Sequence, residues 1–229
     1  MHVSIVGRIR KLLEAIDAEI PGGDPRDVTL NQALELLVAQ GSAQYEEFTR
    51  PGRAFWTGTT TAVAGVVAIP TTAVMLALFN NAIDGGKSLI IDWIAAQNVA
   101  STAVATQAQM LALIGQTRET APTAAAITFK KMNGLAGGAN QQVDSVAIPI
   151  IGGTALPATT GIVGNWFPVG QNAVKPGVTT TPGYGTYQRL DGSVIVPPGR
   201  YFAMHVLSSV VGETFQGFIG WHERQITLG

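Results

Sequence analysis

Histidines and carboxylates are the first residues to consider for chemistry, because the chain contains no cysteine. The histidines are His2, His205 and His222, and the last two fall in neighbouring strand-like segments near the C-terminus. Glu213 or Glu223 could join them as a metal ligand if those segments form a hairpin. The His-x-His spacing that suits a metal site on a strand is absent, however. We therefore expect surface or interface histidines, with neither a metal site nor a bound cofactor.

No motif for nucleophilic or phosphate chemistry withstands closer reading. Gly86-Lys87-Ser88 looks like the end of a phosphate-binding loop, but Asn81 stands where the first glycine is required. A strand-like segment also follows, where a helix would have to begin. There is no Gly-x-Ser-x-Gly motif. We expect a protein that is not an enzyme; the alternative is catalysis by two carboxylates that converge in the fold, as in glycoside hydrolases.

Charge is scarce along this chain. Only 13% of its 229 residues are charged, and the formal net charge is −1. This balance lacks the basic character of nucleic-acid-binding proteins, so we expect no nucleic-acid partner. The absence of cysteine excludes a disulfide scaffold. So few charges on a chain of this length suggest that much of the surface faces other proteins in the working state.

The first 58 residues are predicted to form a helical arm with a connector. Apolar residues at helical spacing predict one amphipathic helix over residues 5–20 and a second from Thr29 to Gly41. Two such short helices cannot bury their apolar faces alone, so they must dock on the β domain, on each other or on another chain. The connector over residues 44–58 contains four aromatic residues that either fill pockets on a partner or close the local core: Tyr45, Phe48, Phe55 and Trp56.

Residues 62–79 form the one apolar stretch long enough to be considered for a membrane span. Pro70 interrupts it, and its residues are small or β-branched. Two buried strands on either side of Pro70 explain this pattern better than a transmembrane helix does. We expect no membrane partner.

Residues 59–229 are predicted to form a mainly β domain. Strand-like segments, separated by Gly- and Pro-rich turns, cover residues 63–69, 74–79, 87–96, 124–132, 143–151, 193–196, 201–211 and 214–224. Residues 99–116 read as a pair of strands, with a helix as the alternative. Eight or nine strands fit an antiparallel two-sheet jelly-roll sandwich better than a seven-stranded immunoglobulin-type domain.

Several details of this domain are also predicted. Alternation within residues 87–96 places Leu89, Ile91, Trp93 and Ala95 on one face. Between residues 152 and 192, glycine, proline and threonine predict a long ordered loop with one or two short strands. Its aromatic residues Trp166 and Tyr184 are therefore candidates for a ligand-binding loop. Asp191-Gly192 is a strong turn signal. The four tryptophans show no regular spacing of the kind that would indicate a carbohydrate platform.

Two stretches carry a resemblance to a known group of proteins. Residues 71–98 join a strand ending in Phe-Asn-Asn to a Gly-Gly-Lys-Ser turn and a Leu-Ile-Ile-Asp strand. Residues 194–223 contain a Pro-Pro-Gly-Arg-Tyr corner followed by a hairpin. Both resemble the small jelly-roll virion proteins of tailed bacteriophages, which include capsid decoration (cement) proteins and domains of head or tail fibres.

The resemblance implies a structural virion protein that is made in the host cytoplasm and located in the virion. It further implies a homotrimer bound to the major capsid protein or to other virion proteins. We expect a decoration- or cement-type subunit that attaches through its N-terminal arm. The alternative is a trimeric receptor- or glycan-binding head or tail fibre protein, shaped like tumour necrosis factor, that contacts its ligand through Trp166 and Tyr184.

Overall fold

The structure is a computed structural model that describes part of the chain in detail. The described residues are 28–30, 36–38, 46–49, 52–101, 105–122, 129–134, 145–151, 156–157, 165–175 and 184–225. The chain divides into two compact units, Met1–Ala43 and Gln44–Gly229. The predicted boundary at residues 58 and 59 thus falls inside the second unit.

The first unit contains two short strands, β1 (Val28–Leu30) and β2 (Leu36–Val38), which pair antiparallel with Val28 opposite Val38. The predicted helix from Thr29 to Gly41 is therefore wrong at these residues. Val28 and Thr29 are β-branched and favour strands, and a short amphipathic helix gains little without a packing partner. The predicted helix over residues 5–20 and the side chain of Tyr45 lie outside the described residues.

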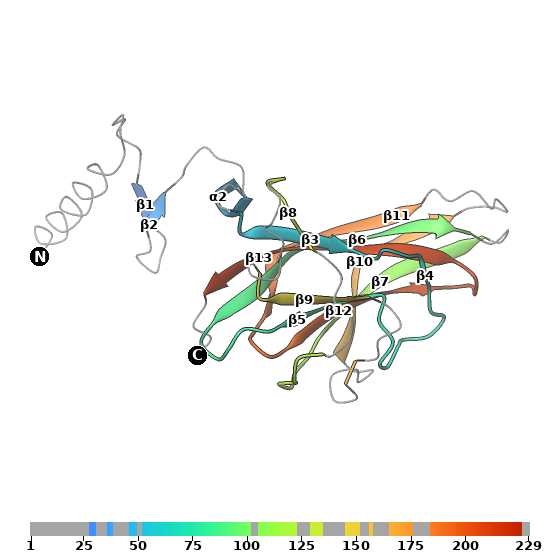
Figure 1. The fold of residues 1–229 in the computed structure, drawn as a ribbon. Helices are drawn as coiled ribbons and strands as arrows, with labels where there is room; N and C mark the ends of the chain where they lie inside the picture. The colour runs from blue at the N-terminus through green and yellow to red at the C-terminus, as the bar shows by residue number, and fades with distance from the viewer. Residues whose placement is uncertain are drawn as a thin grey trace, which may run out of the picture. The chain divides into compact units, whose positions relative to one another are not determined.

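The second unit consists mainly of two antiparallel sheets (Figure 1). The six-stranded sheet has the order β11 (Gly185–Val196), β6 (Lys87–Ala100), β13 (Thr214–Gln225), β3 (Ala54–Gly58) and β8 (Lys130–Lys131), and β4 (Val63–Ala64) also pairs with β13. The five-stranded sheet has the order β10 (Trp166–Lys175), β7 (Thr106–Ile114), β12 (Tyr201–Ser208), β5 (Leu76–Asn80) and β9 (Ala147–Ile151). A four-residue helix, α2 (Glu46–Thr49), precedes β3. The prediction of a mainly β, two-sheet sandwich is confirmed.

The main core fills the space between the two sheets. Its fully buried large side chains include Phe55, Phe202, Phe215 and Trp221. A second cluster covers the outer face of the five-stranded sheet and includes Val74, Leu156 and Trp166. Neither cluster covers the outer face of the six-stranded sheet in the described part of the chain. Of the two outer faces, only that of the five-stranded sheet is therefore covered by a core cluster.

Two strands are far longer than the sequence pattern predicted. β10 has ten residues and β11 has twelve, where a long loop with short strands was expected. β10 pairs with β7 and β11 pairs with β6. Each pairing contains a register shift, and the turn-forming residues of β10 and β11 lie at these shifts. Asp191 and Gly192, with φ of 43° and 81°, form such an irregularity inside β11. The turn signal at these residues therefore marks a bulge within one strand.

The last two strands do not form the predicted hairpin. β12 lies in the five-stranded sheet and pairs with β5 and β7, whereas β13 lies in the six-stranded sheet between β6 and β3. The turn between them carries the chain from one sheet to the other. Each strand gains two partners in this way, which a simple hairpin at an edge would not provide.

The predicted face of residues 87–96 is right for Leu89 and Ile91 and wrong beyond them. Ile91 pairs with Trp221 but Trp93 pairs with Gly220, so Asp92 is an extra residue in β6. This β-bulge shifts the alternation by one residue, and Ile94 joins the core. Trp93 consequently lies on the outer face of the sheet.

The position of β3 predicts where the chain can be shortened. A fragment of residues 44–229 should unfold cooperatively with the melting temperature of the sandwich in the full chain. A fragment of residues 59–229 lacks β3 and the buried Phe55, whose loss alone costs about 3–5 kcal/mol. It should be unfolded or greatly destabilised in thermal melts followed by circular dichroism. Equal melting temperatures for the two fragments would contradict the place of β3 in the sheet.

Candidate functional site

The aromatic residues predicted to contact a partner occupy different environments. Phe55 is 1% exposed and packs against Phe129 and Trp221, so its side chain belongs to the core. Trp56 is half-buried on the outer face of the six-stranded sheet, with the Lys130 Nζ 5.2 Å from its ring centre. Alternation along β3 explains the difference, because neighbouring side chains on a strand point to opposite faces.

The third of these aromatics, Phe48 of α2, lies against the sheet. Its ring stacks on the imidazole of His222, with 4.0 Å between the ring centres. His222 Nδ1 in turn lies 2.8 Å from a carboxylate oxygen of Asp92. Burial raises the pKa of Asp92, and the hydrogen bond with His222 opposes that rise. Phe48 therefore contributes to the local packing of its own domain.

The residues predicted to form a ligand loop are not exposed together. Trp166 is 7% exposed within the second core cluster, and its indole N–H donates to the Thr71 carbonyl at 3.5 Å. Tyr184 is half-buried, and its hydroxyl donates to Glu213 Oε2 at 3.1 Å. Both side chains thus have structural partners within the sandwich.

His205 and His222 lie in different sheets and do not form a site. His205 is buried, and its Nδ1 accepts the Val206 backbone N–H at 2.9 Å. Burial lowers the pKa of His205, so the neutral imidazole is favoured. Among the residues that the structure describes, no three His, Asp or Glu side chains lie where they could share a metal ion.

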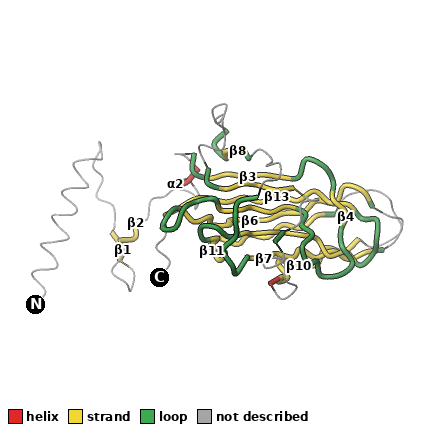
Figure 2. The backbone as a smooth tube through the Cα atoms, turned by 60° about the horizontal axis from the view of Figure 1, so that its bottom comes forward, coloured by secondary structure: helices red, strands yellow, loops and turns green. Residues whose placement is uncertain are grey.

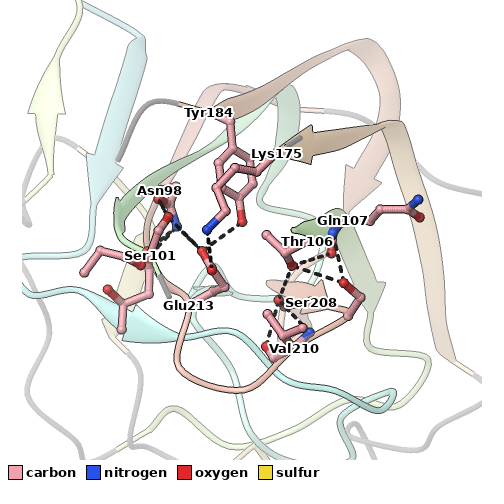
Figure 3. A network of polar contacts seen from close by, with 12 residues as sticks. Asn98, Ser101, Thr106, Gln107, Lys175, Tyr184, Ser208, Val210 and Glu213 are labelled. Carbon is pink, nitrogen blue, oxygen red and sulfur yellow. Dashed lines mark hydrogen bonds and ion pairs between the residues drawn. The ribbon is translucent and has the colours of Figure 1, made fainter. Parts of the chain in front are cut away.

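Glu213 is the centre of a dense polar network (Figure 3). It is fully buried, and its Oε2 accepts hydrogen bonds from Asn98 Nδ2 at 3.0 Å, Ser101 Oγ at 2.9 Å and the Tyr184 hydroxyl. Its Oε1 lies 3.2 Å from Lys175 Nζ, in an ion pair whose two side chains are 7% and 0% exposed. We call these five residues the Glu213 clamp.

The clamp connects the two sheets at one end of the sandwich. Lys175 ends β10 of the five-stranded sheet, whereas Asn98 belongs to β6 and Glu213 immediately precedes β13 of the six-stranded sheet. A buried carboxylate is tolerated only when its lone pairs are used and its charge is paired. Burial and the neighbouring carboxylate of Glu213 raise the pKa of Tyr184, which keeps its hydroxyl a donor. Because Glu213 is enclosed and accepts from four groups, the clamp suits a structural role better than proton transfer.

Hydroxyl groups fix the turn beside the clamp. Thr106 Oγ1 lies 3.1 Å from Ser209 Oγ, which accepts the Gln107 backbone N–H at 2.9 Å. Ser208 Oγ donates to the Val210 carbonyl at 2.9 Å. The turn from β12 to β13 is therefore held by β7 on one side and by Glu213 at its end (Figure 3).

Exposed valines surround this fixed turn. Val211 in the turn is 77% exposed, and Val67, Val99 and Val174 are 57%, 38% and 55% exposed. Backbone pairing brings them to the same end. Val174 is opposite Gln107, whose backbone carbonyl accepts the Ser209 N–H. Val67 follows Val66, which has backbone hydrogen bonds with Val206 and Ser208 at the end of β12. Val99 follows Asn98, which pairs with Phe215 at the start of β13. We call Val67, Val99, Val174 and Val211 the valine rim. The segments that carry these four exposed side chains meet at the end of the sandwich that contains the Glu213 clamp.

A second buried glutamate lies at the other end of β13. Glu223 is 3% exposed and accepts the Val146 backbone N–H at 2.8 Å and the Ser145 hydroxyl. Lys87 Nζ approaches it at 3.3 Å, with the Lys87 side chain 50% exposed. The two glutamates thus attach both ends of β13 to segments leading into or out of the five-stranded sheet.

The sequence pattern suggested Glu213 and Glu223 as metal ligands or as two of several candidate catalytic carboxylates, and it gave no sign of the groups that each of them binds. Lys175 and Glu213 are 38 residues apart, and no spacing rule joins them. The available signal was the rarity of charge, because a chain that is 13% charged must place each charge with some purpose. The valine rim was equally hidden, since its members come from four separate segments.

The clamp predicts a strong, partner-dependent effect on stability. Glu213→Ala should cost about 3–5 kcal/mol, because it leaves Lys175 buried without a counter-charge. Lys175→Met combined with Glu213→Gln should cost less than the sum of these two single changes in urea unfolding at neutral pH, and that difference is the coupling energy. The control is Lys87→Met, which removes the half-exposed partner of Glu223 and should cost less than about 1 kcal/mol. Equal effects of Lys175→Met and Lys87→Met would contradict the clamp.

In the described part of the chain, no helix has the length and hydropathy needed to span a bilayer. No protein-family model matches the sequence, and comparisons with curated proteins and with solved structures also found no match. The function of the chain therefore has to be inferred from the clamp and the surfaces around it.

Proposed function

We propose that this chain is a structural virion protein, an oligomeric decoration- or cement-type subunit that binds other virion proteins. The resemblance of residues 71–98 and 194–223 to jelly-roll virion proteins motivates this proposal. The strand order supports the jelly-roll part of it. Numbering β3, β5, β6, β7, β10, β11, β12 and β13 from one to eight, one sheet has the order 6-3-8-1 and the other 5-4-7-2. Successive strands thus alternate between the two sheets, except that the fourth and fifth pair within one sheet, and this order is that of a double Greek key.

The valine rim is the observation that carries the proposed role. Large aliphatic side chains that are exposed on neighbouring segments are candidates for a contact with another protein. The clamp fixes the backbone beneath the rim, so little conformational entropy is lost on association. The rim offers apolar contact area of the kind through which a subunit packs against other proteins. By resemblance, we propose a homotrimer in which copies meet at this end.

The presence of a separate first unit, Met1–Ala43, supports different roles for the two units in the proposed function. This unit is compact by itself, and the sandwich begins only at Gln44. In the proposed role, the sandwich forms the body of the oligomer and the first unit attaches it to the major capsid protein or another virion protein.

The rim should determine the oligomeric state. Light scattering should give the mass of a trimer for the full chain and for residues 44–229. Val174→Asp combined with Val211→Asp should reduce the mass to that of a monomer without changing the circular dichroism, because two charges would be buried in each contact. The matched control is Ile83→Asp, an 80% exposed side chain in the turn before β6, which should leave the mass unchanged. A monomeric full chain would contradict the proposal.

Attachment to virions should require the first unit. Tailed-phage particles purified from a culture carrying this gene should contain the chain, as detected by mass spectrometry. After the chain is stripped from these particles with mild denaturant, added full-length protein should rebind, and residues 44–229 should remain in solution. Absence of the chain from particles would contradict the virion role. Rebinding of the fragment would place attachment in the sandwich.

A further inference from the structure

The outer face of the six-stranded sheet carries a row of residues that pair directly across five strands. Lys130 pairs with Trp56, Trp56 with Gly220, Gly220 with Trp93, and Trp93 with Arg189. Directly paired residues share one face of a sheet, so all five side-chain positions point the same way. Figure 2 shows β3, β13, β6 and β11 side by side. We call these five residues the aromatic row.

Glycines allow the aromatic rings to lie across the backbone of neighbouring strands. A Cβ atom at Gly220 would lie 2.2 Å from ring atoms of Trp93, and one at Gly58 would lie 2.5 Å from the Phe218 ring. Trp93 and Phe218 are half-buried, consistent with one ring face against the sheet and the other toward solvent. Tyr187 is 57% exposed, and its ring centre lies 5.9 Å from that of Trp93. Together these rings form a broad aromatic floor.

Polar side chains border this floor. Gln97 and Gln216 pair with each other, in phase with Ala95 and Phe218 two residues away, so they lie on the same face. Gln97 is exposed and Gln216 is half-buried. Amide side chains donate and accept hydrogen bonds, which makes them suitable partners for hydroxyl groups. The face therefore combines flat aromatic surface with neutral hydrogen-bonding groups.

The cations of the row are already engaged. Arg189 Nε lies 3.3 Å from Asp191 Oδ1, and Lys130 lies over the ring of Trp56. A nucleic-acid strand would require a track of cations for its phosphates beside the stacking rings. The row does not provide that track. It also differs from the valine rim, because flat rings with amide neighbours replace aliphatic side chains.

We propose that the aromatic row is a binding platform for an oligosaccharide. The apolar C–H face of a pyranose ring stacks on an indole or phenol ring, while its hydroxyl groups reach the amides at the border. The backbone positions of Trp56 and Trp93 are two strand spacings apart, about 9.6 Å, and the Trp93 ring lies over Gly220 between them. The row therefore suits an extended ligand of linked sugar rings. This inference does not depend on the virion role, because it rests on the outer face of the six-stranded sheet and uses none of the residues of the valine rim.

The full chain can be tested with soluble oligosaccharides as probes. Cellohexaose, maltohexaose, xylohexaose and chitohexaose would be titrated by calorimetry and by tryptophan fluorescence. At least one should bind and change the fluorescence. Trp93→Ala and Trp56→Ala should each weaken binding several-fold, because each removes a ring on which a sugar would stack. The control is Trp166→Phe, on the covered outer face of the other sheet, which should leave the affinity unchanged.

Two further variants separate binding from folding and from self-association. Trp93→Phe keeps an aromatic ring and should retain more affinity than Trp93→Ala. Gly220→Ala introduces a methyl group where the Trp93 ring lies and should weaken binding while every polar group is kept. Failure of all four probes, or binding unaffected by both Trp→Ala variants, would overturn the platform. A fall in oligomer mass with Trp93→Ala, and no sugar binding, would identify the row as a contact between copies instead.

Discussion

Burial of two glutamates on one strand is the constraint on which the rest of this structure depends. Glu213 and Glu223 lie at opposite ends of β13, and each accepts hydrogen bonds from groups associated with the five-stranded sheet. A buried carboxylate without these hydrogen-bond donors would be strongly unfavourable, so the donors specify how the two sheets are aligned. Apolar packing alone would tolerate small displacements of one sheet over the other. The two glutamates oppose such displacements, because moving one sheet over the other would break several charged hydrogen bonds at once.

This fixed alignment makes the surfaces of the sandwich distinct from one another. The Glu213 end holds a rigid turn within the valine rim, which suits contact with a protein. The outer face of the five-stranded sheet is covered by its own cluster around Trp166. The outer face of the six-stranded sheet instead exposes rings and amides. A single sandwich can therefore associate through one end and retain a separate face for a different ligand.

The sequence was sufficient for features that depend on local pattern and insufficient for those that depend on register. Alternation and turn residues predicted a mainly β chain and the approximate positions of β5, β9, β12 and β13. The strand lengths of β10 and β11 were missed, because their glycines form bulges against long partners. Trp56 and Trp93 have no regular spacing along the chain and become neighbours only through Gly220. The predicted helix from Thr29 to Gly41 was wrong at β1 and β2, where β-branched residues favour strands.

The bulge at Asp92 shows how one extra residue creates the aromatic row. Without it, Asp92 would pair with Gly220 on the outer face, and Trp93 would point into the core beside Ile91. The bulge leaves Asp92 buried, and the hydrogen bond to His222 satisfies its carboxylate. The neighbouring strand β11 changes register at the same level, through Asp191 and Gly192. The outward position of Trp93 thus coincides with a register shift in β11 and with a buried Asp–His pair, so the exposure of this ring follows from the pairing of three strands.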